Sequence, residues 1–297
     1  MMMMVIPPAY ASGPTPEPGS EIDDDLASDM PDDLVDQTAP AFDGTYKIHL
    51  SESGKSSTSA RPEPGYFDRL VITLFDKASL SARLSPQEPW KRQLEKSAKE
   101  PGHVIYPTTR TKAREDHFKW VGPISRTVWN LYGFSTTDWQ NARFDTVLRE
   151  ASIGVLLGSA REAYLRKSGA QKLVMVPREE LLLPMLMAHR VDMIAIGGNI
   201  LRHYIKAADK LPKIESKLAY RTCYLYVAVS GDVPDRDITT LQDQLDRFKR
   251  SGFFIQNRRD HGLSTNAFKP FLRAMLDLDN NGVGCVDLNG HHGDAGH

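Results

Sequence analysis

The feature that most constrains this chain is a repeated succession of apolar strand, short polar turn and amphipathic helix in its central part. Residues 153–157 form an apolar run, Gly158 and Ser159 follow as a turn, and an amphipathic helix comes next. The alternation recurs as strand 172–176, helix 178–188, strand 191–196, helix 199–207 and strand 224–229. Because helices that alternate with strands cover the faces of a parallel sheet, the sequence predicts an α/β fold with a mainly parallel sheet.

Further elements flank this central part. Residues 45–50 alternate like a strand, residues 66–78 carry apolar side chains at helical spacing, and residues 103–106 form a short strand. Residues 237–250 indicate a helix that ends at Gly252. A chain of 297 residues exceeds the usual size of one core, so the length favours two domains.

Composition limits the classes of partner. The chain has 25% charged residues and a formal net charge of -1, which gives no electrostatic reason to expect a nucleic-acid partner. No apolar run reaches the roughly 18 residues of a membrane-spanning helix. The sequence therefore favours a small molecule or another protein as the partner.

The N-terminal segment and the two cysteines leave alternatives open. Residues 1–9 are apolar and Ala9-Tyr10-Ala11 resembles a signal-peptidase site, but no basic residue precedes them. A truncated signal peptide and a disordered leader both fit. Cys223 and Cys285 permit one disulfide in an oxidising compartment and equally fit two reduced, packed thiols.

Residues 108–124 place arginines and threonine hydroxyls directly after a predicted strand. Ligands of open α/β sheets bind at such strand ends. The guanidinium of Arg114 there can hold a carboxylate or phosphate through two charge-assisted bonds, with hydroxyls beside it. A solvated basic turn is the alternative.

This segment resembles the family-3 solute-binding proteins of ATP-binding-cassette importers, in residues 111–114 and 118–123. The resemblance implies that Arg114 clamps a ligand carboxylate and that Thr109 and Thr111 assist. Trp120 stands where the family has a small polar residue, which puts the identity of the ligand in doubt.

Two further stretches are similar to the same family. Residues 153–165 match its second-lobe motif, in which Gly158 and Ser159 with the following helix N-terminus form an anion site; an ordinary N-cap by Ser159 is the compatible alternative. Residues 185–195 match the passage before the family's amine-pairing carboxylate, but Gly197 and Gly198 stand there. A standard amino-acid ligand is therefore not favoured, unless another acid such as Asp68 reaches the amine.

The resemblance covers about residues 46–256 and implies a two-lobed periplasmic binding protein type 2 fold, with a ligand cleft between lobes joined by two hinge crossings. Residues 1–44 are then a leader with linker, 45–125 and 226–275 lobe one, 126–225 lobe two, and 276–297 a flexible tail. Trp90 and Arg92 match a P-W-x-R subset near the cleft, with core packing as the alternative for Trp90. Aromatic cover for the ligand is expected from Tyr66, Trp90 and Trp120.

The function that the resemblance implies is capture of a small anionic or zwitterionic ligand for a membrane permease, by a monomer in the periplasm or outside the cell. No catalytic signature occurs, and no cofactor is expected. A sensory module remains an alternative, as does a lyase or dehydratase that recruits Glu115, Asp116 or His117. No metal is expected: residues 277–285 resemble a calcium loop without its closing acid, and the histidines at 291, 292 and 297 are tail residues.

Overall fold

The computed structural model describes residues 41–51, 64–86, 88–206, 213–266, 268–277 and 284–288. Within these ranges the strands are β1 (Tyr46–His49), β2 (Ala82–Ser85), β3 (His103–Thr109), β4 (Phe118–Phe134), β5 (Ser152–Leu156), β6 (Lys172–Val176), β7 (Met193–Gly197), β8 (Ile214–Ser230) and β9 (Cys285–Asp287). The α-helices are α1 (Tyr66–Lys77), α2 (Trp90–Lys99), α3 (Phe144–Glu150), α4 (Ala160–Lys167), α5 (Leu182–Met187), α6 (Gly198–Lys206), α7 (Asp235–Arg250), α8 (Phe253–Asp260) and α9 (Lys269–Asp277). Short 3-10 helices are η3 (Lys112–His117), η4 (Asp138–Asn141) and η5 (Glu179–Leu181).

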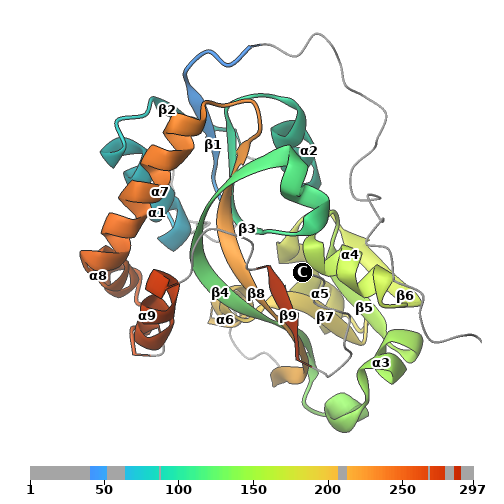
Figure 1. Cartoon of the computed structure of the whole chain (residues 1–297). Coiled ribbons are helices and arrows are strands. Elements are labelled where there is room, and N and C mark those ends of the chain that lie inside the picture. Colours follow the sequence, from blue (N-terminus) through green and yellow to red (C-terminus); the bar gives the residue numbers. More distant parts are fainter. Residues whose placement is uncertain are drawn as a thin grey trace, which may run out of the picture.

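Two long antiparallel strands, β4 and β8, run through both lobes and join them (Figure 1). The strand order is β2-β1-β3-β8-β4-β7-β5-β6, with β9 added beside β8. β3 pairs with the C-terminal half of β8, and β7 pairs with the C-terminal half of β4. The register between β4 and β8 shifts between Val121 and Ser125, where one lobe passes into the other. This arrangement confirms the predicted two-lobed α/β architecture with two hinge crossings.

The prediction of a mainly parallel sheet needs a correction. Pairing is parallel among β1, β2 and β3 and among β5, β6 and β7, but every pairing of β4 and β8 is antiparallel. The sequence placed only residues 224–229 in β8, whereas the strand begins at Ile214. Its first half contains polar residues such as Glu215 and Ser216, so the pattern lacks the apolar run expected of a buried strand.

Each lobe has its own core. In lobe one, Leu70 and Leu74 of α1 and Leu241 and Leu245 of α7 pack on one face of the sheet and are fully buried. In lobe two, apolar side chains of the central strands pack with α3 and α4; this core includes Leu131, Val147, Ile153, Val155 and Met193. Each lobe therefore has an apolar core of its own on its side of the strands that join the lobes.

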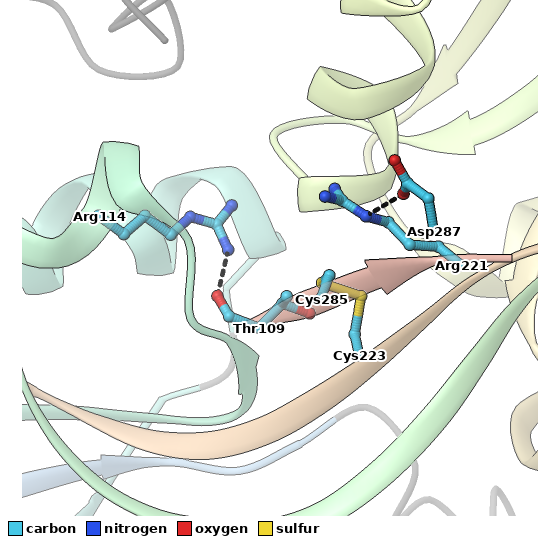
Figure 2. The surroundings of a disulfide bond; sticks show 6 residues. All are labelled: Thr109, Arg114, Arg221, Cys223, Cys285 and Asp287. Atoms are coloured by element: carbon cyan, nitrogen blue, oxygen red, sulfur yellow. Dashed lines mark hydrogen bonds and ion pairs between the residues drawn. A yellow bond between two sulfur atoms is a disulfide. The ribbon is translucent and has the colours of Figure 1, made fainter. Parts of the chain in front are cut away.

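Near the C-terminus, β9 pairs antiparallel with β8, and Cys285 forms a disulfide with Cys223 (Figure 2). The Asp287 carboxylate lies 2.7 Å from Nε of Arg221, also on β8. This settles the pairing that the sequence left open, and β9 is an ordered strand within the segment expected to be a flexible tail. Most of the calcium-like loop and the tail histidines lie outside the described residues. None of the helices in the described ranges has the length and apolar character needed to cross a membrane.

Candidate functional site

The carbonyl oxygen of Gly158, in lobe two, accepts hydrogen bonds from two side chains of lobe one. Nη2 of Arg114 and Nε1 of Trp90 each lie 3.0 Å from it. Arg114 belongs to η3, directly after β3, and is only 2% exposed. Its Nη1 also donates to the backbone carbonyl of Thr109 at 3.4 Å (Figure 2). A buried guanidinium therefore sits where the two lobes meet.

The turn at Gly158 requires glycine for two reasons. Its φ of +71° lies in the left-handed region, which disfavours side chains. A Cβ at this position would lie 3.1 Å from Cβ of Lys91, at the start of α2 in lobe one. The absence of a side chain thus allows the lobes to approach closely at the predicted ligand-binding turn.

Ser159 caps α4, as the structural alternative predicted. Its Oγ accepts a hydrogen bond from the backbone N–H of Glu162 at 3.1 Å. In return, Oε2 of Glu162 accepts from the N–H of Gly158 at 2.6 Å, and Oε1 lies 2.8 Å from Arg166. The S-x-x-E spacing thus gives a variant of the reciprocal cap, in which the glutamate accepts from the residue before the N-cap. The Glu162 carboxylate therefore already occupies one amide of the expected anion site, and a ligand anion has to share or displace it.

The two threonines lie beside Arg114. Thr109 is 8% exposed and contributes its backbone carbonyl, while Thr111 precedes η3 and its carbonyl accepts from the Arg114 N–H at 3.0 Å. Both threonines thus hold Arg114 in place through the backbone. Their role toward a ligand, through their hydroxyls, remains a prediction.

Trp120 lies in the core of lobe one rather than in an open aromatic wall. It is 4% exposed and packs edge to face with Tyr226 at a centroid distance of 6.0 Å. The guanidinium of Arg110 lies 5.7 Å from both rings and is bonded to the Glu115 carboxylate, with Nε to Oε2 at 2.8 Å. The two rings therefore support the loop that leads into η3.

The structure does not bring Tyr66 or Arg92 together with this group. Tyr66 begins α1 and lies in the lobe-one core, where its ring meets His261 and the guanidinium of Arg258. Arg92 is exposed on α2 and forms no hydrogen bond or ion pair with any residue in the described ranges. The P-W-x-R spacing puts Trp90 and Arg92 on different sides of the helix, since positions two apart do not face each other.

At the end of β7, the guanidinium of Arg161 lies near the position where an acid would be needed to pair with the amine of an amino-acid ligand. A Cβ at Gly197 would lie 3.5 Å from Nη2 of Arg161, and one at Gly198 would lie 2.5 Å from the hydroxyl of Tyr132. Arg161 forms an ion pair with Glu179 at 3.5 Å. Asp68, the other acid considered, is buried in lobe one and accepts from the backbone of Ser51 and the hydroxyl of Tyr106.

Sequence reasoning missed several residues around Gly158. The sequence around Lys91 and Arg161 contains no motif that would distinguish these two residues from ordinary surface cations. Glu162 was detectable, because S-x-x-E at a helix start predicts a reciprocal cap. No group of metal-ligating side chains that could hold an ion occurs among the residues that the structure describes.

No protein-family model matches the chain, and no curated protein sequence matches it. Solved structures do resemble it. A mutant of ArgBP from T. maritima has a TM-score of 0.63 at 13% identity, covering 73% of this chain and 94% of that chain. The arginine-, lysine-, histidine-binding protein ArtJ from Geobacillus stearothermophilus has a TM-score of 0.63 at 13% identity, with 77% and 99% covered.

A third similar structure is the ancestral amino acid-binding protein AncCDT-1, described as a precursor of cyclohexadienyl dehydratase. Its TM-score is 0.60 at 12% identity, and the match covers 73% of this chain and 94% of that chain. At these identities the likeness shows a common fold.

Proposed function

We propose that this chain is a solute-binding protein that captures a small anionic or zwitterionic molecule by closing its two lobes. The observation that carries the proposal is the buried Arg114 guanidinium on the Gly158 carbonyl, because it places a cation at the junction of the lobes. The fold shared with ArgBP and ArtJ supports the same role.

The contact is suited to exchange for a ligand. Arg114 donates to the carbonyl oxygens of Thr109 and Gly158, which are neutral acceptors. A carboxylate offers charge-assisted hydrogen bonds that are roughly twice as strong as neutral ones. When the hinge strands β4 and β8 open the lobes, a ligand anion can therefore replace the Gly158 carbonyl and draw α4 back toward Arg114 on closing.

The charge around β7 favours an anionic ligand over a cationic one. Residues 197 and 198 are glycines, and the buried Glu179 carboxylate near this strand end is already paired with the guanidinium of Arg161, so among the described residues no unpaired acid stands there to hold an amine. Burying a cation without a partner is costly. ArtJ binds arginine, lysine and histidine, so this chain is expected to differ from it in ligand charge.

The remaining parts of the proposal follow from this role. A monomeric binding protein of this kind acts in the periplasm or outside the cell and delivers its ligand to a membrane permease. It performs no chemistry on the ligand. In agreement, Glu115, the acid nearest to Arg114 in the chain, is held by Arg110 rather than positioned as a base.

A thermal-shift screen tests the proposal. Purified protein is heated with amino acids, small carboxylates, polyamines and oligopeptides, because a ligand of the native state raises the melting temperature. We expect a shift with small carboxylates that is lost in Arg114→Met, and no turnover of the bound compound by NMR. An absence of any shift, or an unchanged shift in Arg114→Met, contradicts the proposal.

A further inference from the structure

A cavity of about 190 Å³ lies at the outer edge of lobe one, on the face of the sheet that α2 covers. Its polar lining residues come from β1, β2, α2 and the start of β3: Lys47, Arg83, Ser85, Lys96, Glu100 and His103. We call it the edge cavity. β3 starts here at His103 and ends near Arg114, and a seven-residue strand spans roughly 20 Å, so the edge cavity is separate from the interlobe contact.

Three of its side chains form one row across the sheet. Lys47 of β1 is the direct partner of Arg83 on β2 and of His103 on β3. Side chains directly opposite each other on neighbouring strands point to the same face, and like charges in such a pair destabilise a sheet. The pair of Arg83 and Lys47 is therefore unfavourable unless a negative group lies between the two cations.

The described residues place two carboxylates near these cations, those of Glu100 and Glu88. Glu100 lies 3.2 Å from Nε2 of His103, and Glu88 lies 3.8 Å from Nζ of Lys96, at the distance limit of an ion pair. Nζ of Lys47 lies 3.3 Å from His103 rather than on an acid. Arg83 is exposed and pairs with no acid in the part of the chain that the structure describes. Among the residues that the structure describes, three cations thus line the cavity together with one carboxylate, that of Glu100, while Glu88 reaches Lys96 from outside the lining.

His103 lines the cavity on the β3 side and contacts a second buried histidine, His49 of β1. His103 and His49 are each 1% exposed, and Nδ1 of His103 lies 2.7 Å from Nε2 of His49. Burial, and then the nearby charges of His49, Lys47, Lys96 and Arg83, lower the pKa of His103 to about 3. Burial also lowers the pKa of His49 to about 4, although Glu88 acts in the opposite direction. At His103 the charges of Lys47, Lys96 and Arg83 add to the effect of burial, and the same three cations attract an anion.

We propose that the edge cavity is a second ligand site, independent of the interlobe cleft, and that it binds a phosphate group. Arg83, Lys96 and Lys47 supply the charge from three separate elements, and the hydroxyl of Ser85 supplies a hydrogen bond. A tetrahedral oxyanion accepts from several donors at once, which suits cations that converge from a sheet and a helix. Free phosphate and the headgroup of an anionic lipid share this chemistry.

Calorimetric titration of the full chain tests the site in two arms. Inorganic phosphate is the probe in the first, and phosphatidylglycerol vesicles are the probe in the second. Arg83→Gln and Lys96→Gln each remove one cation, and Lys99→Gln is the matched control, because Lys99 is exposed on α2 and does not line the cavity. Circular dichroism checks that each variant is folded.

We expect the protein to bind inorganic phosphate, the vesicles or both. The affinity for the bound probe should fall about tenfold in Arg83→Gln and in Lys96→Gln, and change less than about twofold in Lys99→Gln. Binding of inorganic phosphate assigns a soluble ligand, and binding of vesicles alone assigns a lipid headgroup. Bound phosphate is also expected to raise the pKa of His103 in a proton NMR titration. No binding in either arm, or an equal loss in all three variants, overturns the site.

Discussion

The two ends of β3 carry positive charge in different surroundings. Just beyond its C-terminal end, Arg114 is buried and donates to two backbone carbonyls, one of them from the other lobe. At its N-terminal end, His103 lies beside Lys47, which in turn lies beside Arg83, and the residues that line the cavity there all belong to lobe one. A site at the C-terminal end therefore depends on closure of the lobes, whereas a site at the N-terminal end does not. Substitutions at the lobe junction are thus expected to leave binding at the edge cavity unchanged. Substitutions at the edge cavity are expected to leave binding at the lobe junction unchanged.

The largest expected effect comes from the disulfide that fastens β9 to β8 near the lobe junction. Replacing Cys223 and Cys285 by serine opens a loop with a sequence separation of 62 residues. On the chain-entropy model this lowers the free energy of unfolding by about 4 kcal/mol. Urea denaturation measures it, with the reduced wild-type protein as the control. A loss below about 1 kcal/mol contradicts the expectation.

Next in size is the effect of Arg114→Met on the interlobe ligand. Loss of a desolvated charge partner costs about 3 kcal/mol, or roughly a hundredfold in affinity for the carboxylate found in the thermal-shift screen. Calorimetry of that ligand is the measurement, and Arg92→Met is the control, since Arg92 is exposed and forms no hydrogen bond or ion pair within the described ranges. Phosphate binding at the edge cavity is expected to be unchanged in both variants. If Arg114→Met weakened binding of phosphate as well as of the carboxylate, the two ends of β3 would not be separate sites.

A smaller effect is expected from the cap of α4. Ser159→Ala removes the oxygen that accepts from the N–H of Glu162, which lowers the free energy of unfolding by about 1 kcal/mol. Ser159→Asp preserves the cap and is expected to retain stability in the same denaturation experiment. If both variants lose equal stability, the capping role assigned to Ser159 is wrong.

The effect that is smallest near neutral pH concerns the two buried histidines. Their pKa values are lowered in the folded state to about 4 for His49 and about 3 for His103. Below about pH 6.5 the two histidines bind protons in the unfolded chain but stay neutral in the folded chain. The free energy of unfolding therefore falls as the pH is lowered toward 4. His103→Gln should reduce this slope by roughly 1 kcal/mol per pH unit between pH 6 and pH 4, in denaturation series at several pH values. An unchanged slope contradicts the lowered pKa of His103.

Much of the fold was predictable from local patterns. Residues 172–176 were expected as a strand and form β6, because a short apolar run between turns needs no distant information. The first half of β8 was missed because Lys217 and its polar neighbours break the apolar run; Lys217 is buried through contacts with the carbonyl of Thr137 and with Gln140. β9 was missed because its three residues are ordered by a partner that is distant in sequence.

The candidate site was predictable only in part. Arg114 and Gly158 came from motif resemblance, and the structure brings them into contact. Aromatic character alone did not separate Trp90, which reaches the Gly158 carbonyl, from Tyr66, which packs in the lobe-one core. The edge cavity was not predicted, because the cross-strand row of Arg83, Lys47 and His103 exists only once three strands have paired.

The measurement that tests the central claim most directly is the distance between the lobes during ligand titration. Fluorescent labels at Asp243→Cys in lobe one and Met175→Cys in lobe two use exposed positions and leave the disulfide intact. We predict that energy transfer rises to a plateau as the carboxylate ligand binds the wild-type protein, and that it stays constant in Arg114→Met. Equal transfer with and without bound ligand in the wild-type protein would contradict capture by closure of the lobes.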